Sequence, residues 1–557
     1  MRLAELLEGQ PFRCLSGTVD TVVGGLTHDS RRVKPGTVFF CLPGRRHDGR
    51  EFAPEAAARG AVAVVAESLP PSLPRVQPAV TTVIVPDARR SFALAAAAFW
   101  GQPAAGLRLF AVTGTNGKTT VNHLVEAILR EDGRPAGLIG TVENHLGNLS
   151  VPSDLTTPDA QEIQAGLAAM SAAGLRYACL EVSSHGLVGR RLDGCAVDVA
   201  ALTNVARDHL DFHGTVKDYA AAKLRLFQSL GRVMGTGDGR FRSPAPPKRG
   251  PVYAVLNSDD CFFDLFRAAL PAPYLAYGAV RAGHVKLTAA VLGVTGSRVS
   301  VAFCRRPRGL PPADWLDPAP DWPETAALLF PHPGRHNVAN LLAALAVAWA
   351  EGCRWEAARR AAESFRGVRG RWEVVHSPDG VVGVVDFAHN PGGLVRALET
   401  ARLVARRRVI LVFGCEGQKD RGKRSVMGAI ASRLADHVIL TQDNTFQEDG
   451  RQILDDIEVG LRGEVLPPRE VGWSGLRRRA TYEVIEDRRE AIFRAAALAR
   501  AGDLVVVAGR GHDVKLVFGS RVEILDDREV LRQALLAAHH LPSYSHSMVE
   551  GGLEVTS

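Results

Sequence analysis

The chain has 557 residues, of which 46% are hydrophobic and 23% charged, and it carries a formal net charge of +7. This length and composition are typical of a globular enzyme with roughly three domains of about 150 residues each. Its apolar runs are too short to span a membrane, and the first residues, MRLAELLEGQPF, lack a signal-peptide pattern. These features exclude an inserted membrane protein and predict a cytoplasmic one.

Neither the positive charge nor the eight cysteines indicate a nucleic-acid-binding or zinc protein. Arginine is spread along the chain without an RNA-binding signature, so the charge favours anionic small molecules and no nucleic acid. The cysteines form no CxxC pair, and several lie in apolar runs. This pattern predicts reduced, buried thiols.

Residues 1–104 are predicted to form a small α/β domain. Apolar runs at Val38–Leu42 and Ala61–Ala66 are typical of buried strands, and Glu55–Arg59 is typical of a helix. A proline-rich interval around 70–78 follows. Strands that alternate with helices in this way favour a layered α/β fold.

Residues 105–368 are predicted to form a second α/β domain around a largely parallel sheet. An apolar strand at 107–114 leads through a glycine-rich turn into a helix at Thr119–Glu131. Further buried runs, Tyr177–Val182 and Val197–Leu202, are separated by helical stretches, as parallel strands require.

A third α/β domain is predicted at 369–541. Its expected strands are Val381–Val385, Val409–Phe413, His437–Leu440 and Leu504–Val507. Residues 231–250 and 305–324 break the pattern of the second domain and are predicted to be surface loops, because they are rich in proline, glycine and charge. Residues 542–557 lack periodicity and are predicted to form a disordered tail.

A phosphate-binding loop is the strongest motif in the chain. The segment GTNGKTT follows a buried strand and opens a helix, so backbone N–H groups and the helix dipole converge on one anion site. The lysine adds a charge for the β- and γ-phosphates, and the next hydroxyl can bind Mg²⁺. We expect a nucleoside triphosphate to be bound by Gly114, Thr115, Asn116, Gly117, Lys118, Thr119 and Thr120.

The spacing of this loop, GxxGKT, resembles the Mur ligase family more than the common phosphate-binding loop, which has four residues between its glycines. The family includes the ligases of peptidoglycan precursors, folylpolyglutamate synthetase and the C-terminal half of cyanophycin synthetase. The resemblance extends over residues 25–530. It implies an α/β fold of three domains, with ATP and Mg²⁺ as cofactors: a central P-loop parallel-sheet ATPase domain, an N-terminal UDP-binding α/β domain and a C-terminal Rossmann-like α/β domain.

Three side chains beyond the loop match the metal site of the family. Glu181 lies at the end of a buried strand in YACLEVSSHGL, His209 at the end of another in TNVARDHLDFHG, and Lys223 on a helix in DYAAAKLRLF. Taken alone, they are also compatible with an ion-paired surface glutamate, a capping histidine and a lysine extended along apolar surface. The resemblance implies that Thr119, Glu181, His209 and Lys223 bind Mg²⁺, that Lys223 is carbamylated, and that Lys118, Lys223 and His209 are catalytic.

Further motifs resemble the family's contacts with ATP. GRHN precedes a long Ala/Leu helix and places Asn337 at the adenine side. In the third domain, GRWE, DFAHNP and GCEGQKDRGKR resemble the mobile domain that closes over ATP and delivers the amine. The resemblance implies that Arg371, Asp386 and Lys423 contact the nucleotide or assist closure, although each residue alone could be structural.

The acid substrate is indicated by the segment THDSRRVKPGTVFFCLPGRRHDG, which resembles the family's uridine-nucleotide domain and includes Ser30. Within the family, the chain is most similar to the branch that adds the third amino acid of the peptidoglycan precursor. A guanidinium suits an anionic substrate, and Gly189 departs from the glutamine common in this branch. The residues that fall where the branch holds the UDP-muramoyl dipeptide are Thr156, Thr157, Ser183 and Arg191.

The amino acid pocket differs from that of the members that add diaminopimelate. They carry a DNPR segment, whose arginine binds the distal carboxylate, and later GKGHE; this chain has DNTF, with Asp443, Asn444 and Phe446, and later GRGHD. An aromatic ring at Phe446 cannot pair with a carboxylate. We therefore expect Asp443 and Asn444 to bind a diamino acid without a second carboxylate, such as lysine or ornithine, unless Arg510 or Lys419 replaces the arginine.

The combined interpretation is an ATP-dependent ligase of peptidoglycan synthesis. It would activate UDP-N-acetylmuramoyl-L-alanyl-D-glutamate as an acyl phosphate and join it to an amino acid. We expect a monomer whose partners are small molecules. Two alternatives stay open: the HNPGG segment differs from the HTPDA usual in this branch and would suit a ligase acting on another acid, of the cyanophycin or polyglutamate type, and the fold could serve a non-catalytic nucleotide-binding regulator.

Overall fold

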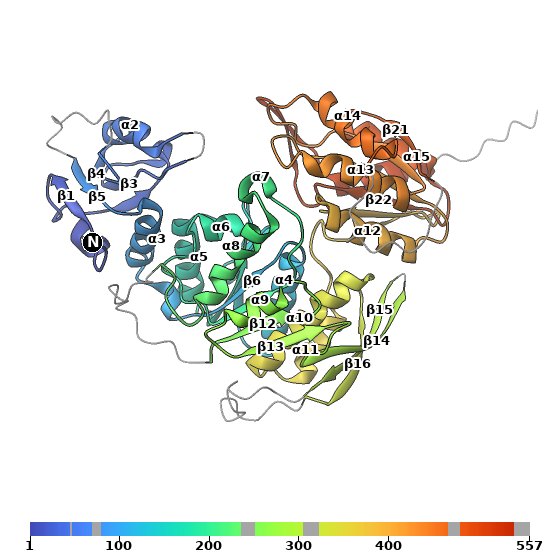
Figure 1. The fold of residues 1–557 in the computed structure, drawn as a ribbon, viewed down its shortest axis with the longest axis horizontal. Helices are drawn as coiled ribbons and strands as arrows, with labels where there is room; N and C mark the ends of the chain where they lie inside the picture. Colours follow the sequence, from blue (N-terminus) through green and yellow to red (C-terminus); the bar gives the residue numbers. More distant parts are fainter. Residues whose placement is uncertain are drawn as a thin grey trace, which may run out of the picture. The chain divides into compact units, whose positions relative to one another are not determined.

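The computed structural model describes residues 1–44, 47–69, 80–235, 251–293, 295–304, 322–465 and 479–539. The chain divides into two compact units, Met1–Val368 and Arg369–Ser557 (Figure 1). Most of the two predicted surface loops and the whole predicted tail lie outside the described residues, and the three-domain boundaries stay predictions. Within the described ranges, no helix combines the length and apolar character that a membrane crossing requires.

The first unit begins with a five-stranded sheet in the order β1-β5-β4-β3-β2, parallel except for β1. Helices α1 and α3 pack on one face of this sheet and α2 on the other. The elements are α1 (Leu3–Leu6), β1 (Arg13–Ser16), β2 (Gly25–Thr27), η1 (Ser30–Arg32), β3 (Thr37–Phe40), η2 (Gly49–Phe52), α2 (Ala53–Ala58), β4 (Ala61–Ala66), β5 (Thr81–Ile84) and α3 (Ala88–Phe99).

The same unit continues into an eleven-stranded sheet in the order β16-β15-β14-β13-β12-β11-β6-β10-β7-β8-β9, whose centre is parallel and whose ends are antiparallel. Its elements are η3 (Pro103–Ala105), β6 (Arg108–Thr113), α4 (Lys118–Glu131), β7 (Ala136–Ile139), β8 (Glu143–His145), β9 (Ser150–Pro152), α5 (Ala160–Ala172), β10 (Tyr177–Val182), α6 (Ser184–Val188), β11 (Val199–Leu202), α7 (Leu210–His213), α8 (Val216–Gln228), β12 (Tyr253–Asn257), α9 (Phe263–Ala268), β13 (Tyr274–Gly278), β14 (Val285–Gly293), β15 (Gly296–Phe303), β16 (Thr325–Phe330), α10 (Arg335–Glu351) and α11 (Trp355–Glu363).

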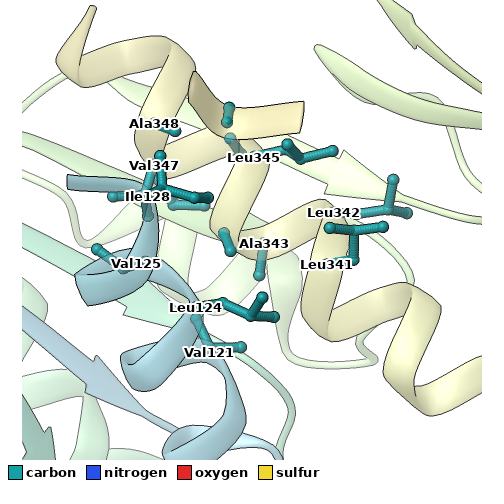
Figure 2. Close-up of a cluster of buried hydrophobic side chains, with 14 of the residues drawn as sticks. Val121, Leu124, Val125, Ile128, Leu341, Leu342, Ala343, Leu345, Val347 and Ala348 are labelled. Atoms are coloured by element: carbon teal, nitrogen blue, oxygen red, sulfur yellow. The ribbon is translucent and has the colours of Figure 1, made fainter. Parts of the chain in front are cut away.

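Helix α4, which follows the phosphate-binding loop, is fixed by apolar packing against α10. Figure 2 shows Val121, Leu124 and Ile128 of α4 lying against the Ala/Leu-rich face of α10, and these side chains are buried together in one core. Helices α5, α8 and α9 cover the opposite face of the sheet. Because β6 and α4 are held from both sides, the loop between them has a defined position.

The second unit is an α/β domain around a six-stranded sheet in the order β17-β18-β22-β19-β20-β21, parallel except for β17. Helices α12, α13 and α14 pack on one face, and α15 and α16 on the other. The elements are β17 (Glu373–His376), β18 (Val382–Asp386), α12 (Pro391–Val404), β19 (Val409–Phe413), α13 (Gly422–Leu434), β20 (His437–Leu440), α14 (Gly450–Leu461), β21 (Thr481–Val484), α15 (Arg488–Leu498), β22 (Leu504–Ala508), β23 (Lys515–Phe518), β24 (Arg521–Ile524) and α16 (Asp527–His539).

The predicted buried strands coincide with the central strands of these sheets, so the α/β fold class is confirmed. Four of them, β4, β10, β19 and β20, have the predicted bounds. All eight cysteines are free, and five of them are buried as expected, whereas Cys14, Cys261 and Cys304 are exposed. The prediction of buried thiols is wrong for these three; Cys14, for example, lies on β1, all four residues of which are exposed.

Replacing Leu124 by alanine tests the packing of α4. Its side chain is fully buried between α4 and α10, so the Leu124→Ala variant should lose about 2–5 kcal/mol of unfolding free energy through lost burial and a residual cavity. Leu329, which is 57% exposed, is the matched control; Leu329→Ala should change stability by less than about 0.5 kcal/mol. Urea denaturation followed by circular dichroism measures both, and equal losses would contradict this account.

Candidate nucleotide and substrate site

The loop between β6 and α4 requires glycine at both ends. Gly117 has φ +89°, and a Cβ there would lie 2.3 Å from Oδ1 of Asn340 on α10. A Cβ at Gly114 would lie 1.8 Å from the hydroxyl of Thr203. Asn340 and Thr203 therefore approach the loop so closely that a side chain at Gly117 or Gly114 would push them or the loop out of place.

Backbone and side-chain hydrogen bonds join this loop to the segment after β11. The amide N–H of Thr115 donates to the carbonyl of Asn204 at 2.7 Å, and the hydroxyl of Thr203 and the amide group of Asn204 donate to the carbonyl of Asn116 at 2.6 and 2.9 Å. Since β6 and β11 are adjacent parallel strands, their carboxyl ends meet at one edge of the sheet, where ligands bind in α/β folds.

Two lysines converge on the loop. Nζ of Lys118 donates to the carbonyls of Gly114 and Thr115 at 3.0 and 2.9 Å, and Nζ of Lys223 on α8 donates to the same Gly114 carbonyl at 2.9 Å. Lys223 is almost completely buried. Burial, together with the charge of Lys118, holds the pKa of Lys223 well below its usual value.

Glu181 is a buried carboxylate at the end of β10, directly beside the loop. It accepts hydrogen bonds from the Thr119 hydroxyl at 2.9 Å and from the hydroxyl and amide of Thr141 at 2.8 and 2.9 Å. The structure thus brings Thr119 and Glu181 together as predicted. An oxygen-rich pair of this kind, a hydroxyl and a carboxylate, fits Mg²⁺.

The sequence predicted His209 at the end of β11, and this prediction is wrong. The strand ends at Leu202, and His209 begins α7 with a left-handed backbone, φ +53°. Its ring lies 4.7 Å from that of His185 and 6.2 Å from that of Tyr219, whose ring faces Lys223 at 4.4 Å. The sequence prediction missed the segment between Leu202 and His209, which carries the histidine beyond the strand end to the side of Tyr219.

Four of the predicted substrate residues form one hydrogen-bonded cluster beyond Glu181. The Thr157 hydroxyl donates to the Glu181 carbonyl at 2.8 Å and accepts from the amide of Ser183 at 2.9 Å; Arg191 donates to the Thr157 carbonyl at 2.6 Å. The Thr156 hydroxyl lies 3.2 Å from that of Thr141. Burial lowers the pKa of the Arg191 guanidinium. The cluster therefore presents hydroxyls and one cation at the edge of the sheet.

Two other predicted residues of the first unit lie elsewhere in it. Ser30 is buried in the N-terminal sheet region, where its hydroxyl donates to Glu55 at 2.9 Å. Asn337 lies in the first turn of α10, and its amide donates to the Pro333 carbonyl at 2.8 Å. Gly189 ends α6, where a Cβ would lie 3.6 Å from Nε of Arg191.

In the second unit, loops after adjacent parallel strands bring three carboxylates together. Glu416 follows β19, Asp443 follows β20, and Asp513 follows β22. The two loops after β19 and β20 touch, because the amide of Gly417 donates to the carbonyl of Asn444 at 2.7 Å. Burial and the charge of Asp443 raise the pKa of Glu416. Burial, Glu416 and Asp443 raise the pKa of Asp513 to about 6.

The predicted residues Arg371, Asp386 and Lys423 belong to the same unit. Asp386 ends β18 and accepts a hydrogen bond from the amide of Trp372 at 2.8 Å, and burial raises its pKa against the opposing charge of Arg371. The Arg371 guanidinium lies 4.3 Å from the centre of the Phe387 ring. Lys423 is buried and donates to the His389 carbonyl at 2.9 Å.

Asn444 connects this region to the β23–β24 hairpin. Its side-chain oxygen accepts from the amide of Val517 at 2.8 Å. A side-chain hydrogen bond between Asn444 and Glu416 opposes the rise in the pKa of that carboxyl. Phe446 has a left-handed backbone, φ +51°, and its amide also donates to the Val517 carbonyl, at 3.2 Å. The hairpin therefore fixes the loop that carries Asp443, Asn444 and Phe446.

Sequence reasoning missed Thr141, Glu416 and Asp513 as candidate site residues. Each lies in the first few residues after a buried parallel strand, namely β7, β19 and β22. That position is a usable signal, because such loops line one edge of a sheet. Thr141 has no acidic or basic group that would single it out in the sequence. Glu416 and Asp513 could be recognised as neighbours only once the spatial order of the strands was known.

Comparisons with known proteins cover nearly the whole chain. Family models match in order: "Mur ligase family, catalytic domain" at residues 22–99, "Mur ligase middle domain" at 112–348 and "Mur ligase, glutamate ligase domain" at 370–511. A protein of Geobacillus thermodenitrificans, named UDP-N-acetylmuramoyl-L-alanyl-D-glutamate--2,6-diaminopimelate ligase, is 38% identical over 96% of this chain and 99% of its own length. The chain belongs to the Mur ligase family.

Two further relatives agree with this assignment. A ligase of the same name from Listeria monocytogenes is 36% identical over 96% of this chain and 99% of that protein. A solved structure, also of a UDP-N-acetylmuramoyl-L-alanyl-D-glutamate--2,6-diaminopimelate ligase, is 30% identical, covers 97% of this chain and 100% of its own, and has a TM-score of 0.61. The resemblance inferred from the sequence is confirmed, and the protein is an ATP-dependent Mur ligase that forms amide bonds.

A Gly117→Ala substitution tests the role of the loop in this Mur ligase. Its new methyl group would meet Asn340 and its backbone is left-handed, so we expect ATP affinity, measured by calorimetry, to fall at least about tenfold. Gly133→Ala is the matched control, because Gly133 has φ +76° but nothing within 4 Å of the added carbon. The control should lose stability only and bind ATP normally; equal affinity losses in both variants would refute the steric explanation.

Proposed function

We propose that this Mur ligase joins a diamino acid to UDP-N-acetylmuramoyl-L-alanyl-D-glutamate in peptidoglycan synthesis. The observation that carries the proposal is that groups suited to ATP and an anionic acid lie in one unit and groups suited to an amine lie in the other. The first unit holds the phosphate loop, Glu181, Lys223 and a cluster suited to an anionic substrate, and the second unit holds a group of carboxylates suited to an amine. The names of the relatives supply the acid substrate.

The reaction proceeds through two displacements. A glutamate carboxylate oxygen of the acid substrate attacks the γ-phosphorus of ATP, the bond to ADP breaks, and an acyl phosphate forms. The amine then attacks the acyl carbon, phosphate leaves with the electrons of the C–O bond, and the nitrogen loses a proton. Such transfers depend on positioning and charge neutralisation, for which Lys118 and the loop N–H groups are placed.

The residues present fit Mg²⁺ at Thr119 and Glu181. Among the described residues, no cluster of three histidine, cysteine or acidic side chains forms a closed metal cage. Mg²⁺ at phosphate sites typically uses one or two protein oxygens together with the phosphates and water, so the open pair meets that requirement. Bound there, Mg²⁺ would neutralise charge on the β- and γ-phosphates. We also assign His209 to the metal region.

Lys223 is suited to carbamylation. Carbamylation needs a neutral amine, and the lowered pKa of Lys223 favours that neutral form. Its nitrogen attacks the carbon of carbon dioxide, one C=O electron pair moves to oxygen, and a proton leaves to solvent. The product carries an anionic oxygen near Lys118 and the Gly114 carbonyl, where the free amine now donates at 2.9 Å.

The acid substrate is assigned to the Thr156–Thr157, Ser183 and Arg191 cluster, with Ser30 toward the uridine end. The cluster is attached to Glu181 through Thr157, so a carboxylate held there lies at the same strand end as the phosphate loop. Arg191 is the one cation of the cluster, and its guanidinium suits phosphate or carboxylate oxygens. We assign Asn337, Arg371, Asp386 and Lys423 to nucleotide binding or closure.

The amino acid is proposed to be lysine or ornithine. The carboxylates of Glu416, Asp443 and Asp513 favour a cationic side-chain amine, whereas Phe446 offers no partner for a second carboxylate. Arg510 is buried between Asp443 and Asp527 and is therefore committed to ion pairs. Diaminopimelate is the second candidate, and the names of the relatives favour it.

Phosphate release by the purified protein with ATP, Mg²⁺ and UDP-muramoyl-L-alanyl-D-glutamate tests this assignment. Lysine, ornithine and meso-diaminopimelate are offered separately, and the product mass identifies the added residue. We expect release with lysine or ornithine, and a Phe446→Arg variant should shift the kcat/KM ratio toward diaminopimelate by about tenfold or more. Phe446→Leu, which stays apolar, is the control. Wild-type preference for diaminopimelate would refute the lysine or ornithine proposal, and silence with all three would favour another acid substrate.

The carbamate is tested by stripping carbon dioxide from the enzyme. Activity should fall and return when bicarbonate is added, and carbon-13 NMR with labelled bicarbonate should show one carbamate signal. Lys223→Arg should remove both the signal and at least about 99% of the activity, because arginine cannot be carbamylated. Lys217, exposed on the same helix, is the control, and Lys217→Arg should behave as wild type. A signal that persists in Lys223→Arg would assign the carbamate elsewhere.

A further inference from the structure

The second unit contains a buried row of alternating charges that ends in the amino acid region. Arg488 forms a two-point ion pair with Asp527 at 2.9 and 2.8 Å. Nε of Arg510 lies 3.9 Å from Asp527, and Nη1 of Arg510 lies 3.7 Å from Asp443. All four side chains are at most 2% exposed. The row connects the start of α15 and α16 to the loop after β20.

Hydrogen bonding is least complete at Arg510: two of its nitrogens have no partner among the described residues, whereas Arg488 leaves only Nη1 without one. Nη2 of Arg510 donates to the carbonyl of Asp513 at 3.0 Å and, more weakly, to that of Leu525 at 3.4 Å. Among the described residues, its Nε and Nη1 have no hydrogen-bond partner. The guanidinium is thus held in place by backbone carbonyls and acts on the two carboxylates through charge. A buried ion with unmet donors costs stability that an apolar side chain would not, which indicates a role beyond folding.

We propose that Arg510 is a positioning residue for the incoming amino acid: it orients Asp443 and balances the charge of the carboxylates that bind the substrate ammonium. This inference rests on the proposed function. Its span between Asp443 and Asp527 links the pocket loop to α16, and its contact with the Asp513 carbonyl fixes the loop after β22. One guanidinium therefore holds two of the three carboxylate-bearing loops.

The charges around Arg510 explain why such a residue is needed. Three carboxylates, Glu416, Asp443 and Asp513, repel one another, and a nearby cation offsets this repulsion. Arg510 is such a cation, since its charge lowers the pKa of Asp513 while burial, Glu416 and Asp443 raise it to about 6. Other charged groups also act on this pocket, namely Lys419, Lys423, Arg371, Arg488 and Asp527, and Nε2 of His512 lies 3.4 Å from the Asp513 carboxylate.

The pH dependence follows with a definite sign. An ammonium pairs with ionised Asp513, so kcat/KM for the amino acid should fall as the pH drops through about 6. Without the positive charge of Arg510, the pKa of Asp513 rises and the midpoint of this fall moves to higher pH. The Arg510→Lys variant keeps the positive charge but lacks the forked guanidinium that reaches two carboxylates. We therefore expect it to restore the pH midpoint fully but the affinity for the amino acid only in part.

The experiment compares wild type, Arg510→Gln, Arg510→Lys and the exposed control Arg494→Gln on the same unit. Steady-state kinetics with lysine and ornithine give KM and kcat across pH. We expect Arg510→Gln to raise KM for the amino acid about tenfold or more, to leave KM for ATP within about twofold, and to move the acidic midpoint upward. Arg510→Lys should return the midpoint to the wild-type value, and Arg494→Gln should match wild type.

Different outcomes separate this inference from the proposed function. If Arg510→Gln raises KM equally for ATP and for the amino acid, or leaves the acidic midpoint of kcat/KM unchanged, Arg510 has only a structural role. A switch in preference between diaminopimelate and lysine in Arg510→Gln would make it a carboxylate receptor instead. If the wild type uses no diamino acid, the proposed function fails. NMR titration of the Asp513 carboxyl then still tests the role of Arg510. An unchanged pKa of Asp513 in Arg510→Gln would overturn the proposed charge balance. Circular dichroism of Arg510→Lys controls for folding.

Discussion

The buried carboxylate of Glu181 is the group on which the arrangement of the first unit depends. A carboxylate removed from water is unfavourable unless hydrogen bonds replace its hydration, and here the donors come from Thr119 at the start of α4 and Thr141 after β7. These bonds join the phosphate loop to two neighbouring strand ends. The backbone carbonyl of the same residue holds Thr157, so the proposed acid-binding cluster is fixed by Glu181 as well.

The second unit also carries its candidate site at the carboxyl ends of parallel strands, but the groups there are acidic instead of basic. Loops after β19, β20 and β22 gather carboxylates, whereas the first unit gathers two lysines at its phosphate loop and places Arg191 beside Thr157. In the proposed reaction, the first unit matches the anionic acid by charge and the carboxylates of the second unit match the cationic side-chain amine of a diamino acid, while the attacking α-amine is neutral. Like charges held this close require compensation, which Arg510 supplies beside Asp443.

Position 446 shows how sequence and structure contribute to the specificity argument. The absence of an arginine at Phe446 is visible in the sequence, and so are Arg510 and Lys419 as possible replacements. The structure adds that Arg510 is buried 3.7 Å from Asp443 and 3.9 Å from Asp527, which favours a role toward these carboxylates. The relatives named for diaminopimelate are 36–38% identical, so the family establishes the ligase chemistry and the pocket must establish the amino acid.

The sequence by itself determined the α/β fold, the central strands, the phosphate loop and the family, because hydrophobic periodicity and a glycine–lysine–threonine spacing are local properties of the chain. It also singled out Glu181 and Lys223 as candidate site residues. Only the tertiary structure decided that Lys223 reaches Gly114, that His209 begins a helix beyond its strand, and that Glu416 and Asp513 join Asp443. These relations depend on the order of strands in space, which places residues about 100 positions apart at one edge and leaves no mark in any short segment.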